Sequence, residues 1–357
     1  MTIKKPNKFI ELIKNTLHIY SAKTCKDGSI VFCDYIKKGH HYSNGVKVEY
    51  EVPYINGEKH GIEKHYYENG QLLCEEPYVR NKKQDISKAY YITGQLKFET
   101  PFVDNKEHGI EKEYFENGKI KEETSYENGK LNGIKKWYYE CGQLLAETQY
   151  KNGEIDGINK VYYKTGQLKY ETSWVNRELH GTHKEYDENG KLWFEILYIK
   201  GKKHGIEKVY YKTGQLRHEI HYVNGERHGI YKEYDENGEL RHECPCVLGK
   251  KHGIEKWYSE NGELKEETPY KNGEKHGTYK EYYENGKLLF EILYENDEKH
   301  GIAKGYYKTG ELRHVLPYVR GEKHGIYKEY DANGKLKCEM VYVNDEKAEI
   351  FDLIDSK

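Results

Sequence analysis

Hydrophobic and polar positions along this chain repeat every 24 residues. We call the set of positions 24 residues apart a column. Three columns hold the same residue type in all twelve copies: lysine from Lys64 to Lys328, tyrosine from Tyr66 to Tyr330 and glycine from Gly70 to Gly334. Each copy contains two short runs in which apolar and polar residues alternate, which is typical of β-strands. A repeat kept in such register indicates one supersecondary unit stacked many times. The pattern therefore predicts an all-β fold, an elongated single-layer antiparallel sheet of about twelve 24-residue hairpins.

The first turn of each copy lies between the two alternating runs, at Glu68-Asn69-Gly70. Asn-Gly at such a place is a strong hairpin signal, and the invariant glycine indicates a positive φ. Threonine, which is poorly suited to the first position of a type I′ turn, replaces the asparagine at four positions, Thr93, Thr165, Thr213 and Thr309. We therefore expect a three-residue loop, a type I turn that ends on a left-handed glycine with a G1 bulge.

The second turn, which joins successive hairpins, is less uniform. It precedes the column headed by Gly61, which is glycine in eleven of twelve copies and Asp85 in the other. The sequence Asn56-Gly57-Glu58-Lys59-His60 predicts an antiparallel connection of about four to five residues.

Strand alternation after a three-residue loop assigns the constant columns to one face of the sheet. On this assignment Ile62, Lys64 and Tyr66 share their face with Leu72 and Tyr78 and form a continuous aromatic-aliphatic stripe. The opposite face carries the columns that vary from copy to copy, together with the nearly invariant column of Glu75. We expect the varying face and the loops to be wet and to provide selectivity.

The two ends of the chain depart from the repeat. Residues 7–20 and 346–357 place apolar side chains at near-helical spacing, which predicts short helical caps for the open edges of the sheet. The N-terminal apolar residues are Phe9, Ile13, Leu17 and Tyr20, and a membrane-surface helix is the alternative for them. The predicted organisation is an N-terminal cap at 1–40, a hairpin array at 41–345 and a C-terminal cap or tail at 346–357.

Composition and charge narrow the class of function. The hydrophobic fraction of 36% and mean hydropathy of -1.04 are low, but 37 tyrosines in periodic columns argue against disorder. The 58 basic and 60 acidic residues are interleaved and leave a net charge of -2, so no global field favours nucleic acid or an anionic membrane.

The cysteines and the chain ends bear on location. The seven cysteines include no CxxC pair and do not follow the repeat, which favours reduced thiols in a cytoplasmic protein. Their one close pair is Cys244-Pro-Cys246. Neither a secretory signal nor an apolar run approaching about 20 residues is present in this sequence.

Three columns invite a chemical interpretation. Histidines before the repeat glycine suggest a metal ladder, but equivalent residues two strands apart are separated by about 9.6 Å, too far to share one ion. We expect these histidines to stack on rings or to bond the loop backbone; they are His60, His108, His180, His204, His228, His252, His276, His300 and His324. The columns of Lys64 and Glu75 allow a phosphate-binding lysine ladder, but lysines that cover tyrosine rings beside carboxylates are the favoured interpretation.

No part of the sequence places a nucleophile, base and orienting group in a setting that breaks the repeat. We therefore predict no catalytic, cofactor-binding or metal-binding residues, and no cofactor.

The segment from Tyr54 to Tyr78, YINGEKHGIEKHYYENGQLLCEEPY, resembles the variant MORN repeat in the form found in the bacterial YwqK-like antitoxin family. The resemblance covers residues 31–345 and implies a single-layer array of antiparallel hairpins. It also implies an antitoxin-like or immunity-like role, in which the repeat protein restrains a partner. Related MORN arrays are proposed to act as membrane-linked or cytoskeletal scaffolds.

The leading hypothesis is a non-enzymatic scaffold that binds another protein, with Trp137, Trp193 and Trp257 as anchor residues. The alternatives are a membrane-apposed tether that binds anionic phospholipid, and an enzyme whose site lies near the N-terminal cap, within 1–45. No nucleic-acid partner is expected, and edge pairing into homo-oligomers is possible.

Overall fold

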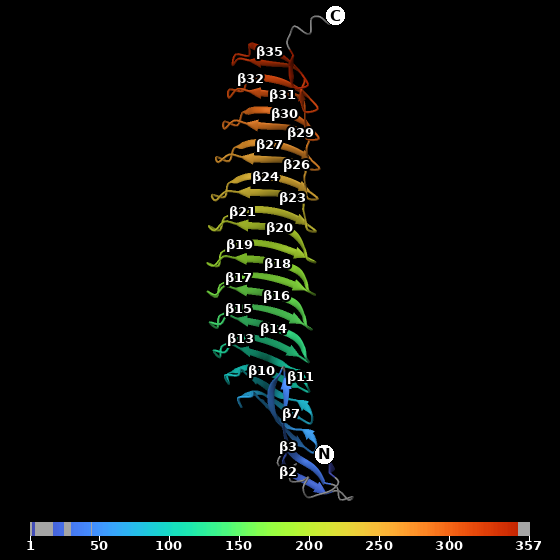
Figure 1. Cartoon of the computed structure of the whole chain (residues 1–357). Helices are drawn as coiled ribbons and strands as arrows, with labels where there is room; N and C mark the ends of the chain where they lie inside the picture. The colour runs from blue at the N-terminus through green and yellow to red at the C-terminus, as the bar shows by residue number, and fades with distance from the viewer. Residues whose placement is uncertain (1, 4–16, 25–29, 44, 349–357) are drawn as a thin grey trace. The chain divides into compact units, whose positions relative to one another are not determined.

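The computed structural model describes residues 2–3, 17–24, 30–43 and 45–348, and these residues form β-strands and turns without a helix. Accordingly, no helix in the described part of the chain has the length and apolarity needed to cross a membrane. The chain divides into two units, 1–178 and 179–357, and within each unit the hairpins follow one another in chain order (Figure 1).

The first unit consists of antiparallel strands, each paired with a neighbour close to it in sequence. Its strands are β1 (Thr2–Ile3), β2 (Leu17–Thr24), β3 (Ile30–Ser43), β4 (Val46–Ile55), β5 (Glu58–Lys59), β6 (Gly61–Tyr66), β7 (Leu72–Val79), β8 (Lys82–Lys83), β9 (Asp85–Tyr90), β10 (Leu96–Val103), β11 (Lys106–Glu107), β12 (Gly109–Tyr114), β13 (Ile120–Glu127), β14 (Lys130–Tyr138), β15 (Leu144–Lys151), β16 (Glu154–Tyr162) and β17 (Leu168–Val175).

The second unit begins one residue into β18 (Glu178–Tyr186) and has the same antiparallel design. Its further strands are β19 (Leu192–Ile199), β20 (Lys202–Tyr210), β21 (Leu216–Val223), β22 (Glu226–Arg227), β23 (Gly229–Tyr234), β24 (Leu240–Val247), β25 (Lys250–Lys251), β26 (Gly253–Tyr258), β27 (Leu264–Lys271), β28 (Glu274–Lys275), β29 (Gly277–Tyr282), β30 (Leu288–Glu295), β31 (Glu298–Tyr306), β32 (Leu312–Val319), β33 (Glu322–Lys323), β34 (Gly325–Tyr330), β35 (Leu336–Val343) and β36 (Glu346–Ala348).

The turn inside each hairpin is the three-residue loop that the threonine replacements predicted. The amide of Gly70 donates to the carbonyl oxygen of Tyr67 at 2.9 Å, and the amide of Tyr67 donates to the carbonyl oxygen of Gln71 at 2.8 Å. Gly70 has φ +79°, whereas Glu68 and Asn69 are not in the left-handed region. Because a single left-handed residue suffices, threonine is tolerated before the glycine.

The turn between hairpins differs from the predicted loop of four to five residues. Ile55 pairs with Glu58, which leaves a two-residue turn at Asn56 and Gly57, both with positive φ (52° and 80°), as a type I′ turn requires. The strand resumes at Glu58 and is interrupted before Gly61, whose φ is +110°. The polar residues that suggested a longer loop are therefore a short strand followed by a bulge.

The predicted assignment of columns to faces is wrong for Glu75 and Tyr78. In every repeat hairpin the register shifts by one residue beside the turn; in the first, Tyr66 pairs with Leu72, but His65 pairs with Cys74. Lys64 is consequently opposite Glu75, and the two form an ion pair at 3.6 Å. One extra residue in the second strand exchanges the faces of everything beyond it.

We name the two faces by their first residues. The Lys64 face carries the columns headed by Ile62, Lys64, Tyr66, Glu75, Pro77 and Val79, and the Glu63 face carries those headed by Glu63, His65, Cys74, Glu76 and Tyr78. Contacts within the first copy support the division, since Lys59 bonds Glu63 at 2.6 Å and lies over the ring of Tyr78 at 4.8 Å.

The core lies on the Glu63 face, which was expected to be wet. Its most buried column is the one headed by Glu76, and the buried members are Thr124, Thr148, Thr172, Ile196, Cys244, Thr268 and Ile292. The buried threonines satisfy their hydroxyls locally; that of Thr268 donates to Glu266 at 2.9 Å. By contrast, the constant Ile62 column is exposed on the other face.

The predicted helical caps are not supported. Leu17 and Tyr20 belong to strand β2, which pairs with β3, and Glu346–Ala348 form β36. Phe9, Ile13 and the tail from 349 onward lie outside the described residues. The proposed boundaries at 40 and 345 stay predictions.

Candidate functional site

A row of tyrosine, glutamate and lysine side chains joins successive hairpins on the Lys64 face. The hydroxyl of Tyr90 donates to Glu75 of the preceding copy at 3.1 Å, and Lys64 pairs with the same carboxylate. In the second unit the corresponding donors are Tyr210, Tyr234, Tyr258, Tyr282 and Tyr306. The lysines of this column had been considered as a phosphate-binding ladder. Where such a lysine pairs with a glutamate of the row, its charge is used in an ion pair inside the sheet.

Beside this row the Lys64 face exposes an apolar strip. In the second unit its isoleucines are 40–55% exposed and its valines 40–46% exposed. We call these residues the Ile–Val strip; they are Ile206, Ile230, Ile254, Ile302, Ile326, Val223, Val247, Val319 and Val343. Equivalent isoleucines and valines are exposed in the first unit, among them Ile110 and Val103. A periodic apolar surface of this kind is typical of an interaction site.

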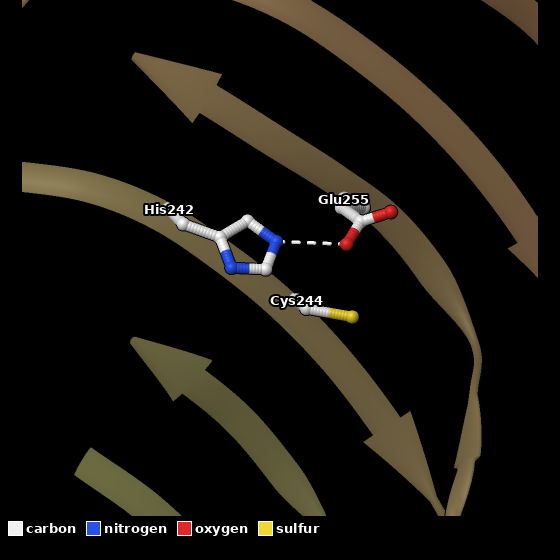
Figure 2. A group of neighbouring side chains, drawn as sticks. All are labelled: His242, Cys244 and Glu255. Atoms are coloured by element: carbon white, nitrogen blue, oxygen red, sulfur yellow. Dashed lines mark hydrogen bonds and ion pairs between the residues drawn. The ribbon is translucent and has the colours of Figure 1, made fainter. Parts of the chain in front are cut away.

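On the Glu63 face of the second unit, three potential metal ligands converge. His242 and Cys244 are two residues apart on β24, and Glu255 lies on the neighbouring β26 (Figure 2). Their donor atoms all lie within 4.8 Å of one another, and all three residues are buried. The Nε2 atom of His242 is 2.7 Å from Oε1 of Glu255.

At this cluster, burial and neighbouring charged groups have opposite effects on the pKa of Glu255. Burial alone would raise the pKa of Glu255, but hydrogen bonds from His242 and Lys251 outweigh it and lower that pKa to about 2. Burial, together with the Glu255 carboxylate, raises the pKa of the Cys244 thiol to about 12. The cluster thus consists of an ionised carboxylate, an imidazole and a protonated thiol at neutral pH.

Aromatic packing fixes the imidazole. The ring of Trp257, which pairs with His242 in the strand register, stacks on it with centroids 3.8 Å apart and an interplanar angle of 13°. The ring of Tyr231 on β23 meets His242 edge-on at 5.4 Å. The imidazole is therefore held between rings contributed by both neighbouring strands.

The structure places the three predicted anchor tryptophans in different surroundings and does not bring Trp193 and Trp257 into a common cluster. Trp137, in the first unit, is half-buried, with the Lys135 ammonium 5.1 Å from its ring. Trp193 and Trp257 are each 40% exposed. Trp193 lies against the neighbouring Phe194, while Trp257 covers His242.

Two turn histidines, His252 and His324, have hydrogen-bond partners in neighbouring turns, whereas the Nδ1 atom of His204 is buried without one. His252 accepts a bond from the amide of Asn272 at 3.4 Å, and Nδ1 of His324 is 3.2 Å from Asn344. The histidine that lies among other donors is instead His242, which sequence reasoning did not single out. The sequence signal that could have pointed to this histidine was the Cys244-Pro-Cys246 pair. Residues two apart share a strand face, so His242 lies on the same face as these cysteines.

A surface hollow of about 330 Å³ lies at the hairpin loops after β26 and β29. It is lined by Ser259, Leu264 and Tyr282, among others, and Ser259 stands where most copies have a tyrosine. In other copies that ring reaches the next hairpin, as when the Tyr283 hydroxyl donates to the carbonyl oxygen of Tyr306 at 2.8 Å. The hollow thus occupies the space that a tyrosine ring at the position of Ser259 would fill.

Comparison with known families follows the same 24-residue period. The model described as MORN repeat variant matches residues 59–80, 107–128, 131–152, 155–176, 179–200, 203–224, 227–245, 251–272, 275–296, 299–320 and 323–344. The chain belongs to the MORN repeat variant family. No curated protein matches it significantly.

The MORN assignment supports a repeat scaffold of the kind that often binds proteins or lipids, and this family is generally non-enzymatic. The matches pass over residues 81–106, the copy in which Asp85 replaces the glycine. Asp85 nevertheless adopts φ +67° and begins β9, so the hairpin of that copy is retained.

Proposed function

We propose that this MORN repeat protein is a non-enzymatic scaffold that binds a protein partner along its Ile–Val strip. The observation that carries the proposal is the exposure of an almost invariant apolar column, since a residue that served only the sheet would be expected to be covered. Burial of such side chains contributes about 25 cal/mol per Å² of apolar area.

A protein fits this surface better than an anionic membrane does. The row beside the strip alternates lysine and glutamate, as in the pairs Lys208–Glu195 and Lys256–Glu243. Such a row presents no net positive charge to attract acidic lipids, whereas a protein can offer apolar side chains together with paired charges.

The narrower version of the proposal is an antitoxin-like or immunity-like role in the cytoplasm, in which the scaffold restrains its partner. The resemblance of the repeat to the YwqK-like family supports this version. Trp193 and Trp257 are exposed and Trp137 is half-buried, so all three stay candidate anchors. Trp137 and Trp257 lie on the Glu63 face, where they would serve a partner that also reaches the face opposite the strip.

The test is affinity purification from the native host with a variant of the strip. Thr182 and Thr278 occupy the isoleucine column naturally, so the triple variant Ile206→Thr/Ile254→Thr/Ile302→Thr is compatible with the fold. We expect this variant to lose the partner that the unaltered protein retains. The matched control alters the loops of the same three copies, as Lys212→Thr/Glu260→Thr/Lys308→Thr, and is expected to keep it.

Retention of every partner by the strip variant, with circular dichroism unchanged, contradicts the proposal. A parallel sedimentation with anionic vesicles separates the membrane alternative, which requires binding that weakens with salt. Alanine at Trp137, Trp193 and Trp257 tests whether the same partner also contacts these side chains, two of which lie on the opposite face. Growth rescue from a partner shown to be toxic tests the antitoxin version alone.

A further inference from the structure

We propose that His242, Cys244 and Glu255 form a binding site for a divalent transition metal of the zinc class, which clips two consecutive repeats together. His242 and Cys244 come from the hairpin β23–β24, and Glu255 comes from the next hairpin, β26–β27 (Figure 2). This inference is independent of the partner-binding strip, which lies on the opposite face.

The donor set suits zinc. Imidazole nitrogen, thiolate sulfur and carboxylate oxygen are the ligands that Zn²⁺ takes, at about 2.0–2.3 Å, which places donor atoms about 3–4 Å apart. Here the three donors lie within 4.8 Å of one another, so small side-chain rotations bring them to bonding distance. On binding, the thiol proton leaves to solvent and the Sγ–metal bond forms. The proton that Nε2 of His242 donates to Glu255 also leaves Nε2, and the ring proton is then on Nδ1, so Nε2 and an oxygen of Glu255 complete three protein ligands.

The imidazole is already oriented for this role. Stacking on Trp257 and edge contact with Tyr231 restrict its rotation, and its Nε2 points at the Glu255 carboxylate. These ring contacts limit the orientations that the imidazole can adopt as a ligand. They also reduce the entropy lost when the ion binds.

Lys251 is the competitor that the metal has to displace. Its ammonium contacts both oxygens of Glu255, at 2.7 and 2.8 Å. The lysine side chain is 42% exposed and its ammonium already lies 4.7 Å from the ring centre of Tyr270, so it can turn to the ring and to water. Release of Glu255 therefore does not strand a buried cation.

The combination is particular to this copy. The Lys–Glu pair recurs at Lys59–Glu63 and Lys203–Glu207, so by itself it is a structural element of the repeat. His242 and Cys244 lie on the strand that pairs with that of Glu255 and precedes it in the chain. At the same two positions of the corresponding strand, neither Glu63 nor Glu207 has a histidine and a cysteine. Within the described residues, the cluster at Glu255 is the group of three donors that meets ligand spacing.

The experiment titrates the purified full chain with Co²⁺ under reducing conditions and records thiolate-to-cobalt charge transfer. We expect a saturable band at one equivalent, lost in Cys244→Thr and in His242→Phe. Both replacements occur naturally in their columns, as Thr268 and Phe290, so the variants are compatible with the fold, and circular dichroism checks this. In Lys251→Leu, a residue that the column also contains, the titration is expected to shift to lower Co²⁺ concentration.

The matched control is Cys74→Ala, because Cys74 lies opposite His65 and near Glu63 on the same face of the first unit. This variant is expected to keep the band. The proposal is overturned if the unaltered protein gives no thiolate band, if the band survives in folded Cys244→Thr, or if Cys74→Ala loses it equally. A second readout is thermal unfolding, in which Zn²⁺ is expected to raise the midpoint of the unaltered protein and not that of Cys244→Thr.

Discussion

The tyrosine–glutamate–lysine row is expected to hold successive hairpins together, and Tyr306→Phe tests this with the loss of one oxygen. The hydroxyl of Tyr306 donates to Oε1 of Glu291 at 2.8 Å, and Lys304 approaches the same oxygen at 3.3 Å. The substitution keeps the ring, so packing is preserved and the hydrogen bond alone is removed.

The expected loss of stability depends on how exposed Glu291 is and on the ion pair with Lys304 that remains after the substitution. A hydrogen bond to a charged acceptor contributes about 1.5–3 kcal/mol when it is well protected. The Glu291 side chain is 21% exposed, and Lys304 still pairs with it, so no buried charge is left alone. We therefore expect the free energy of unfolding to fall by about 1 kcal/mol.

The chain supplies its own control at Tyr330. In the preceding copy Val315 occupies the place of the glutamate and cannot accept a bond, so Tyr330→Phe is expected to change stability by less than about 0.5 kcal/mol. Introducing the acceptor with Val315→Glu is expected to make Tyr330→Phe costly, with a coupling of about 1 kcal/mol in a double-mutant cycle.

The assay is urea unfolding near neutral pH, supported by hydrogen exchange of the amides in β31 and β32, because long repeat arrays can lose strict two-state behaviour. Equal costs for Tyr306→Phe and Tyr330→Phe would refute the reasoning. So would a cycle with no coupling.

Two further predictions concern the backbone and pH. Burial and the bonded glutamate raise the pKa of Tyr306 to about 12, and Tyr282 behaves alike. Because the folded pKa lies above the unfolded value of about 10, this contribution to stability is complete below pH 10 and is lost as the pH rises toward 12; a flat series of urea midpoints from pH 9 to pH 11 would speak against it. Gly229→Ala is expected to cost about 1–3 kcal/mol, since its φ is +119° and an added Cβ would lie 2.9 Å from Cβ of His221. Gly238→Ala, with φ +85° and open space around it, is expected to cost about 1 kcal/mol, and denaturant unfolding that ranked the two in reverse would count against the argument.

The turns show how far local sequence determines this fold. The three-residue loop at Gly70 was predictable because threonine at Thr93 excludes the alternative turn type, a constraint carried by single residues. The two-residue turn at Asn56-Gly57 also has a recognisable dipeptide. It was missed because the polar residues after it resemble a loop, although strand pairing resumes at Glu58.

The faces were not predictable from alternation alone. A single register shift beside the turn, between the pairs Tyr66–Leu72 and His65–Cys74, reverses the face of Glu75 and Tyr78. Nothing in the apolar pattern marks the shift, since both assignments leave constant columns on each face. The opposite charges of Lys64 and Glu75, which recur together, are the signal that favours the observed register, because paired opposite charges across strands stabilise a sheet.

Once the faces are exchanged, variation on the Glu63 face has a different meaning. Buried residues there vary in matched sets: Thr268 is accompanied two residues away by Glu266, which accepts its hydroxyl bond, whereas Ile292 is accompanied by Phe290. In these two copies the polar buried residue has a polar neighbour and the apolar one an aromatic ring; where Ala146 accompanies Thr148, the threonine hydroxyl donates to Asn159 on the next strand instead, at 2.8 Å. Such compensation lets copies diverge without loss of the sheet, and it allows an unusual combination to arise in one copy. His242 and Cys244 are that combination: Cys244 replaces threonine or isoleucine in the buried column, and the carboxylate of Glu255 gives both a charged neighbour. The proposed metal site on this face consequently depends on which residues meet in a single copy, while the exposed isoleucines of the Lys64 face offer the same surface in almost every copy.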